Sequence, residues 1–189
     1  MSDLILETSS TAQWHRLITE AESHCGTHLD EDAESYLVFL LMRYLRRPDL
    51  LRRVMAMGYL QAMLADGHLR EERLRDVGDE CLILTGLFPG QARRRRVNLG
   101  YFIDIGRGAY GHLGESAGTA IAPLYLMLAD AFRDLMDVLN AMRAEHTSLD
   151  VLIADAADRY WQSGSPAARR QLEEAGCMVP PEPGPMRRH

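Results

Sequence analysis

The sequence predicts an all-α fold: a single-domain, orthogonal or irregular helical bundle of about six to eight helices. Apolar residues recur at spacings of three and four along most of the chain, as they do on a helix with one buried face. Prolines and glycines stand between these periodic segments, where they end one helix or begin the next. At 189 residues the chain is long enough for one domain with its own core and too short to expect two.

The first strong helix is expected over residues 31–47, with Asp30 as its N-cap and Pro48 ending it. A helix over residues 69–88 becomes apolar on several sides toward its C-terminal end, which indicates that it enters the centre of the domain. Further helices of this part are expected over residues 13–22, 49–64 and 98–113.

The clearest periodicity predicts one long helix over residues 121–142, with an apolar stripe long enough to serve a subunit interface as well as a core. Shorter helices over 149–161 and 166–175 complete a helical domain predicted to span residues 1–178. The tail over 179–189 is rich in proline and is expected to be flexible.

In the predicted helix over 121–142, the residues of the stripe that repeat every seven positions are Ile121, Leu128, Leu135 and Met142.

Composition and charge exclude several classes of protein. Hydrophobic residues make up 47% and charged residues 25%, which argues against global disorder. A net charge of -6 argues against a general surface for nucleic acid or anionic membranes. No segment approaches the roughly 20 apolar residues of a membrane helix. The first residues lack the basic region of a signal peptide, so we expect a cytoplasmic protein. Every Lys or Arg position is arginine, which favours a bacterial source with GC-rich coding.

The three cysteines, Cys25, Cys81 and Cys177, are odd in number and far apart, with no CxxC pair. The sequence therefore predicts neither a zinc knuckle nor a disulfide framework. Cys81 lies in an apolar run and is interpreted as a small core residue.

Residues 106–111 match the GxGxxG pattern of dinucleotide-binding proteins. Such a site needs a second parallel strand ending in an acidic residue, whereas the following residues have helical periodicity. We therefore interpret these glycines as small residues that let two helices approach closely.

Glu20, His24 and His28 are spaced by four, which on a continuous helix would align three potential metal ligands. Gly26 interrupts the series, and no Glu-x-x-His motif supplies ligands from another helix. Solvated polar residues at a helix end are the favoured interpretation, so no metal or other cofactor is predicted.

Asp79 and Glu80 are the candidate catalytic residues, because they precede an apolar run and at least one is expected to be partly buried. A buried carboxylate needs a cation or several hydrogen-bond donors. Arg107, flanked by small residues, is the expected partner. The pair would be either a catalytic acid or, as recurs in ordinary cores, a structural clasp.

Two further groups are candidate binding sites. Arg93, Arg94, Arg95 and Arg96 form an interaction candidate for phosphate or RNA, although a basic turn on an acidic chain is more often a solvated corner, so nucleic acid is an unlikely partner. The second group would line a pocket for a flat or apolar ligand, although core packing explains the same residues. Its members are Tyr101, Phe102, Tyr110, His112 and Tyr125.

The block from Gly78 to Pro89, GDECLILTGLFP, is followed by Tyr101-Phe102 and by Gly106-x-x-Ala109-Tyr110. This pattern resembles an uncharacterised family of bacterial all-α proteins, over about residues 30–115. The resemblance implies a helical domain of bacterial origin and brings no reaction, cofactor or catalytic residue.

Two function classes follow. The first is a non-catalytic accessory or adaptor protein that acts through protein contacts, as a homodimer or with another protein. The second is an enzyme or carrier whose internal pocket holds a metal, haem or small apolar molecule.

Overall fold

The computed structural model describes residues 2–46, 55–94, 98–116, 120–144 and 149–179. All regular structure in these ranges is α-helical, which confirms the predicted fold class. No helix among the described residues combines the length and the apolar character needed to cross a membrane. The helices are α1 (Ser2–Cys25), α2 (Glu31–Arg46), α3 (Met55–Met63), α4 (Gly67–Leu87), α5 (Pro89–Arg94), α6 (Leu99–Glu115), α7 (Ala122–Asp130), α8 (Phe132–Ala144), α9 (Leu149–Ser163) and α10 (Pro166–Glu174).

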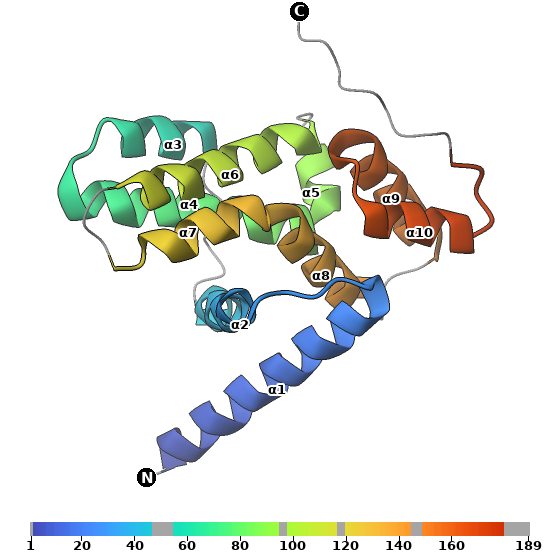
Figure 1. Ribbon diagram of the computed structural model, residues 1–189, viewed down its shortest axis with the longest axis horizontal. Helices are drawn as coiled ribbons and strands as arrows, with labels where there is room; N and C mark the ends of the chain where they lie inside the picture. The colour runs from blue at the N-terminus through green and yellow to red at the C-terminus, as the bar shows by residue number, and fades with distance from the viewer. Residues whose placement is uncertain (1, 47–54, 95–97, 117–119, 145–148, 180–189) are drawn as a thin grey trace, which may run out of the picture.

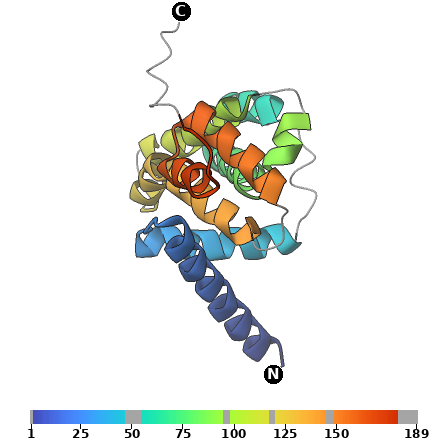
Figure 2. The same ribbon diagram turned by 90° about the vertical axis from the view of Figure 1, so that its right-hand side faces the viewer.

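The helices surround α4, which packs against α3, α6 and α8, while α6 also packs against α7. Helices α1 and α2 cross beneath this group in Figure 1, and the first part of α1 projects away from the body in both ribbon views (Figures 1 and 2). Helices α9 and α10 pack against each other at one end of the molecule (Figure 1). Their small apolar cluster is separate from the main core.

Local sequence signals explain several helix ends. The Asn98 side chain accepts a hydrogen bond of 2.7 Å from the backbone N–H of Gly100, and the Ser165 hydroxyl accepts one of 3.1 Å from Ala168. Both residues thereby satisfy an N–H that has no partner inside the helix. Helix α1 ends before Gly26, whose φ of 64° is left-handed and suits glycine.

Helix α4 confirms the prediction that its later part enters the centre of the domain. Every residue from Val77 to Gly86 is buried, including the polar Asp79, Glu80 and Thr85. The Thr85 hydroxyl donates to the carbonyl of Cys81 at 2.8 Å, so this polar group is satisfied within its own helix.

The expectation of one helix over residues 121–142 is wrong. The chain turns at Ala131, where α7 ends and α8 begins, so the two halves of the apolar stripe face the same core from different directions. Leu128, Leu135 and Val138 are fully buried within the chain itself. Most of the stripe is therefore used by the core, whereas Ile121 at its start is 47% exposed.

Two other elements differ from the predicted ones, and two predicted segments cannot be compared. Helix α1 begins well before the predicted segment 13–22, and α5 makes a short helix where a turn was expected. The start of the helix predicted over 49–64 and the tail from residue 180 lie outside the described residues.

Glycines let α6 approach its neighbours closely, as the interpretation of the GxGxxG pattern predicts. A Cβ added to Gly106 would lie 2.6 Å from the Phe132 ring and 2.8 Å from the Cβ of Cys81. A Cβ on Gly78 would lie 2.5 Å from the ring of Tyr110. Both distances are below normal van der Waals separation, so these glycines set the spacing between helices α4, α6 and α8.

We expect Gly106→Ala to destabilise the fold by about 1–2 kcal/mol, since overpacking costs about 1–3 kcal/mol and better helix propensity returns up to about 1 kcal/mol. Gly111→Ala is the matched control on the same helix, because a Cβ there has nothing within 4 Å. The control should gain up to about 1 kcal/mol. Urea unfolding followed by far-UV circular dichroism measures both, and equal effects would contradict close packing at Gly106.

Candidate functional site

Asp79 on α4 is the centre of a buried polar cluster. One of its carboxylate oxygens, Oδ1, accepts hydrogen bonds from the Tyr36 hydroxyl at 2.5 Å and from the Tyr110 hydroxyl at 2.8 Å. The other, Oδ2, accepts from the Arg43 guanidinium at 2.7 Å. Asp79 is 2% exposed, so protein groups replace the water that its carboxylate has lost. The donors come from α2 and α6, which the cluster joins to α4.

Arg43 carries a second bond in this cluster. Its other terminal nitrogen donates to Asp76, one turn before Asp79 on α4, so the guanidinium bridges both carboxylates. Arg75 adds positive charge near both Asp79 and Tyr125. Two arginines therefore balance two aspartates.

Three tyrosine rings enclose the carboxylate. The rings of Tyr36 and Tyr110 meet edge to face with their centroids 6.0 Å apart, and Tyr110 stacks on Tyr125 at 6.1 Å. Their apolar surfaces keep water from the carboxylate while their hydroxyls supply polar contacts.

Burial raises the pKa of Asp79 above its usual range, although the hydrogen bonds from the two tyrosines and the charge of Arg43 act in the opposite direction. Burial and the neighbouring carboxylate also raise the pKa of Tyr36 and Tyr110 well above the usual value. Both hydroxyls therefore keep their protons at neutral pH and remain donors. Because both carboxylate oxygens are engaged by the protein, this geometry favours a structural clasp over a catalytic acid.

Arg107 is not placed as expected. Its Nε donates to the backbone carbonyl of Ala129 at 3.0 Å, so it joins α6 to α7, and Arg43 takes the place beside Asp79 that the sequence analysis gave to Arg107. Glu80, the other candidate carboxylate, is buried within α4 as expected.

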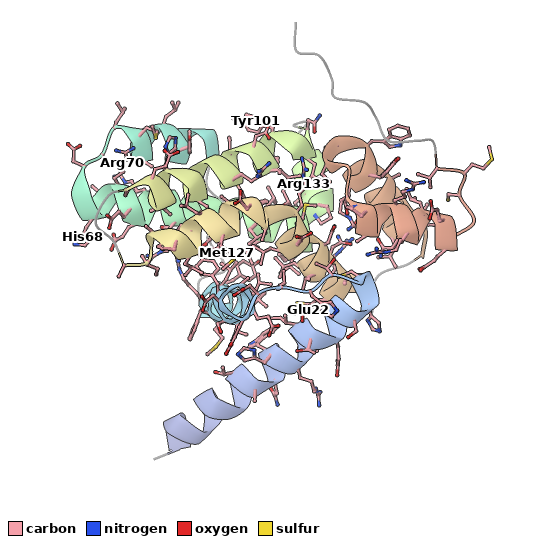
Figure 3. The ribbon with its side chains drawn as sticks, in the orientation of Figure 1. Glu22, His68, Arg70, Tyr101, Met127 and Arg133 are labelled. Atoms are coloured by element: carbon pink, nitrogen blue, oxygen red, sulfur yellow. The ribbon has the colours of Figure 1, made fainter. Side chains whose placement is uncertain are left out.

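The proposed ligand-pocket residues do not converge on one cavity. Phe102 is buried in the core and Tyr110 belongs to the Asp79 cluster, whereas Tyr101 is 42% exposed and points outward from α6 (Figure 3). His112 lies beside the ring of Tyr59 and pairs with Glu115. Of the five candidates only Tyr125 lines the cavity of about 240 Å³ at the outer ends of α4, α6 and α7, where His68 lies at the edge of the molecule (Figure 3). This cavity is lined by His68, Glu71, Glu72, Arg75, Leu113, Ile121 and Tyr125.

The candidate metal ligands are separated by the end of α1. Glu20 and His24 are exposed on α1, where Glu20 pairs with Arg16, and His28 follows in the connection to α2. Within the described ranges, no three or more His, Cys, Asp or Glu residues are grouped as a metal site would require.

The interaction candidate over residues 93–96 stays a prediction. Arg93 and Arg94 lie in α5, but their side chains, like all of residues 95–97, fall outside what the structure describes.

A second buried clasp, absent from the sequence analysis, holds α9 and α10. Arg159 and Asp137 are each 2% exposed and pair at 2.7 Å, and the Ser165 hydroxyl donates to the other oxygen of Asp137 at 2.5 Å. Arg159 also donates to Gln171 on α10. Burial raises the pKa of Asp137, against the opposing effect of Arg159. These polar bonds join the α9–α10 pair to α8.

Sequence reasoning identified Asp79 but missed its partners Tyr36 and Arg43. The available signal is their spacing of seven on α2, which places a phenol and a guanidinium on one face of an amphipathic helix. That pattern indicates that α2 faces a buried carboxylate. It does not identify the residue on another helix to which the carboxylate belongs.

Comparison with protein-family models, with curated proteins and with solved structures gives no match for this chain. The resemblance described above therefore stays a prediction, and the function is inferred from the residues themselves.

Arg43→Met should destabilise the protein by about 2–4 kcal/mol, because it leaves a buried carboxylate without its cation, although part of the Arg43 side chain reaches water. Arg107→Met is the matched control, and the loss of its bond to a carbonyl should cost about 1 kcal/mol. Urea unfolding at pH 7 measures both variants. Equal losses would show that Asp79 does not depend on Arg43.

Asp79→Asn should change how stability varies with pH. The raised pKa means that the folded state binds the proton of Asp79 more tightly than the unfolded state does. The wild type should therefore lose stability relative to the variant as pH rises from about 4 through the folded pKa, by at most about 1.4 kcal/mol per pH unit. Unfolding free energies of both proteins from pH 4 to pH 8 test this, and a slope of the opposite sign would overturn it.

Proposed function

We propose that this protein is a non-catalytic accessory protein that acts through contacts with other polypeptides. One observation carries the proposal: three large apolar side chains are exposed together on α3 and in the turn that directly follows it. Leu60 is 58% exposed, Met63 is 39% exposed and Leu64 is 86% exposed. Residues three and four apart on a helix lie side by side, so the three form one patch. An apolar patch of this kind on a folded protein marks a surface that another molecule covers.

The contacts of the buried carboxylates support the same proposal, because they leave these groups in structural roles. The buried ionic groups Asp79 and Asp137 are each held by side chains from other helices or loops, and these contacts stabilise the packing. Reactive use of either carboxylate would require one of these bonds to break, at the cost of leaving its partner unsatisfied in a dry interior. These two carboxylates therefore serve the fold, and we assign recognition to the surface.

The alternative is a carrier or enzyme with a ligand in an internal pocket. The cavity beside Arg75 and Tyr125 is the feature that favours it, since it borders the Asp79 cluster. Most of its other lining residues are polar and lie at the surface, such as His68 and Glu72, which suits a small polar molecule better than haem or an apolar ligand.

Native mass spectrometry of the protein purified from its own host, compared with its denatured mass, separates the two functions. We expect assemblies made of polypeptides alone, containing two or more chains of which at least one has the 21.3 kDa mass of this protein. A single chain carrying a metal or a few hundred daltons of small molecule would instead support the carrier and contradict the proposal.

A further inference from the structure

The cavity of about 240 Å³ has one polar wall and one apolar wall. The polar wall is a single face of α4, because positions 68, 71, 72 and 75 are three or four residues apart. The apolar wall comes from α6 and the start of α7, which pack beside α4 (Figure 1), and it consists of Leu113, Ile121 and Tyr125. A ligand that matches both walls has charged groups on one side and an apolar group on the other.

Arg75 is the group of the polar wall that points to an anionic part of the ligand. Among the described residues no carboxylate forms a direct ion pair with Arg75, whereas Arg43 pairs with both Asp76 and Asp79. The Nε of Arg75 is buried and has no hydrogen-bond partner in the same part of the chain. Buried polar atoms in folded proteins nearly always have a partner, so this arginine retains hydrogen-bonding capacity. A guanidinium uses such capacity to bind a carboxylate through two parallel bonds.

The two carboxylates of the same wall point to a cationic part of the ligand. Glu71 and Glu72 precede Arg75 by one helical turn, so their Cβ atoms lie about 5–6 Å from that of Arg75. Glu71 pairs with His68 at 3.3 Å, but the His68 side chain is fully exposed, and surface pairs of this kind are weak. An ammonium group can therefore compete for these carboxylates. An α-amino acid carries its ammonium and carboxylate groups on one carbon, which suits sites this close together.

Size and charge narrow the ligand further. A volume of about 240 Å³ holds about eight groups of the size of a water molecule, at about 30 Å³ each. This is similar to the number of non-hydrogen atoms in valine or leucine, and it is below the roughly 300–1,000 Å³ of pockets for drug-sized molecules. A zwitterion also adds no net charge, so it preserves the balance of Arg43 and Arg75 with Asp76 and Asp79.

We propose that this cavity binds a free aliphatic α-amino acid, with its carboxylate on Arg75, its ammonium group on Glu71 and Glu72, and its side chain on the apolar wall. The inference goes beyond the proposed function and does not depend on it, since an accessory protein can bind a small molecule as well as a polypeptide. The ligand contacts both α4 and α7, and a ligand that binds only the folded state stabilises it.

Thermal unfolding of the full chain is the first test, with L-valine, L-leucine, L-isoleucine and L-methionine as probes. At about 10 mM at least one of them should raise the unfolding midpoint by about 3 °C or more. No shift with any of the four would overturn the inference. It would leave the proposed function standing, because contacts with polypeptides do not require the cavity. A single chain that carries an amino acid in the host would do the reverse.

Calorimetry with analogues then tests the two charged contacts on the unaltered protein. For L-leucine the analogues are isocaproate, which lacks the amino group, and isoamylamine, which lacks the carboxylate. Each should bind at least about 10-fold more weakly than the amino acid, because a charged hydrogen-bonding partner in the cavity is left without its ligand group. Equal binding of either analogue would contradict the proposed ligand class.

Variants assign the contacts to residues. Glu71→Gln/Glu72→Gln alters two side chains near the surface, so it should keep the helical circular dichroism while weakening amino-acid binding at least about 10-fold. Glu173→Gln is the matched control, since it makes the same change at an exposed position of α10, and it should bind like the wild type. Arg75→Met should abolish binding. Unchanged affinity in Glu71→Gln/Glu72→Gln, or in a folded Arg75→Met, would overturn the inference.

Discussion

The structure depends on how one buried carboxylate, that of Asp79, is satisfied. Transfer of a charged group from water into an apolar interior is costly unless cations and donors replace the lost water. Here the replacements are Tyr36 and Arg43 from α2 and Tyr110 from α6. Each bond needs its helix at one rotation and one height relative to α4. The cluster therefore fixes the register of three helices whose apolar faces alone would tolerate sliding.

Close packing and the polar cluster reinforce each other. Gly78 precedes Asp79 and leaves room for the Tyr110 ring, so the missing side chain at one position allows the hydroxyl to reach the next. Gly106 likewise lets Phe132 and Cys81 pack closely against the backbone of α6. At the far end of the molecule the apolar cluster of α9 and α10 is separate from the main core, and buried pairs such as that of Arg159 with Asp137 join it to α8. Buried polar bonds thus orient helices that hydrophobic contact brings together.

The contrast between buried polar groups and an exposed apolar surface bears on function. The buried carboxylates of Asp79 and Asp137 are engaged by neighbouring side chains, whereas α3 presents uncharged apolar side chains to the outside. A clasp that holds helices in register gives such a face a fixed shape, which a specific protein contact requires. In this interpretation Asp79 contributes to recognition indirectly, through the rigidity of the body on which α3 stands.

The sequence by itself determined the all-helical fold, the start of α2 and the burial of the later part of α4, because these follow from local periodicity and from the capping residue Asp30, whose carboxylate accepts from the backbone N–H of Asp32. It also marked Asp79 as a carboxylate in an apolar setting. Only the tertiary structure decided that Arg43 rather than Arg107 meets it, since a guanidinium on either helix satisfies the same local pattern. The turn at Ala131 and the exposure of Leu64 were decided in the same way. An apolar residue has the same local preference whether its neighbour is the chain's own core, a second molecule or water, and that neighbour is set by long-range packing.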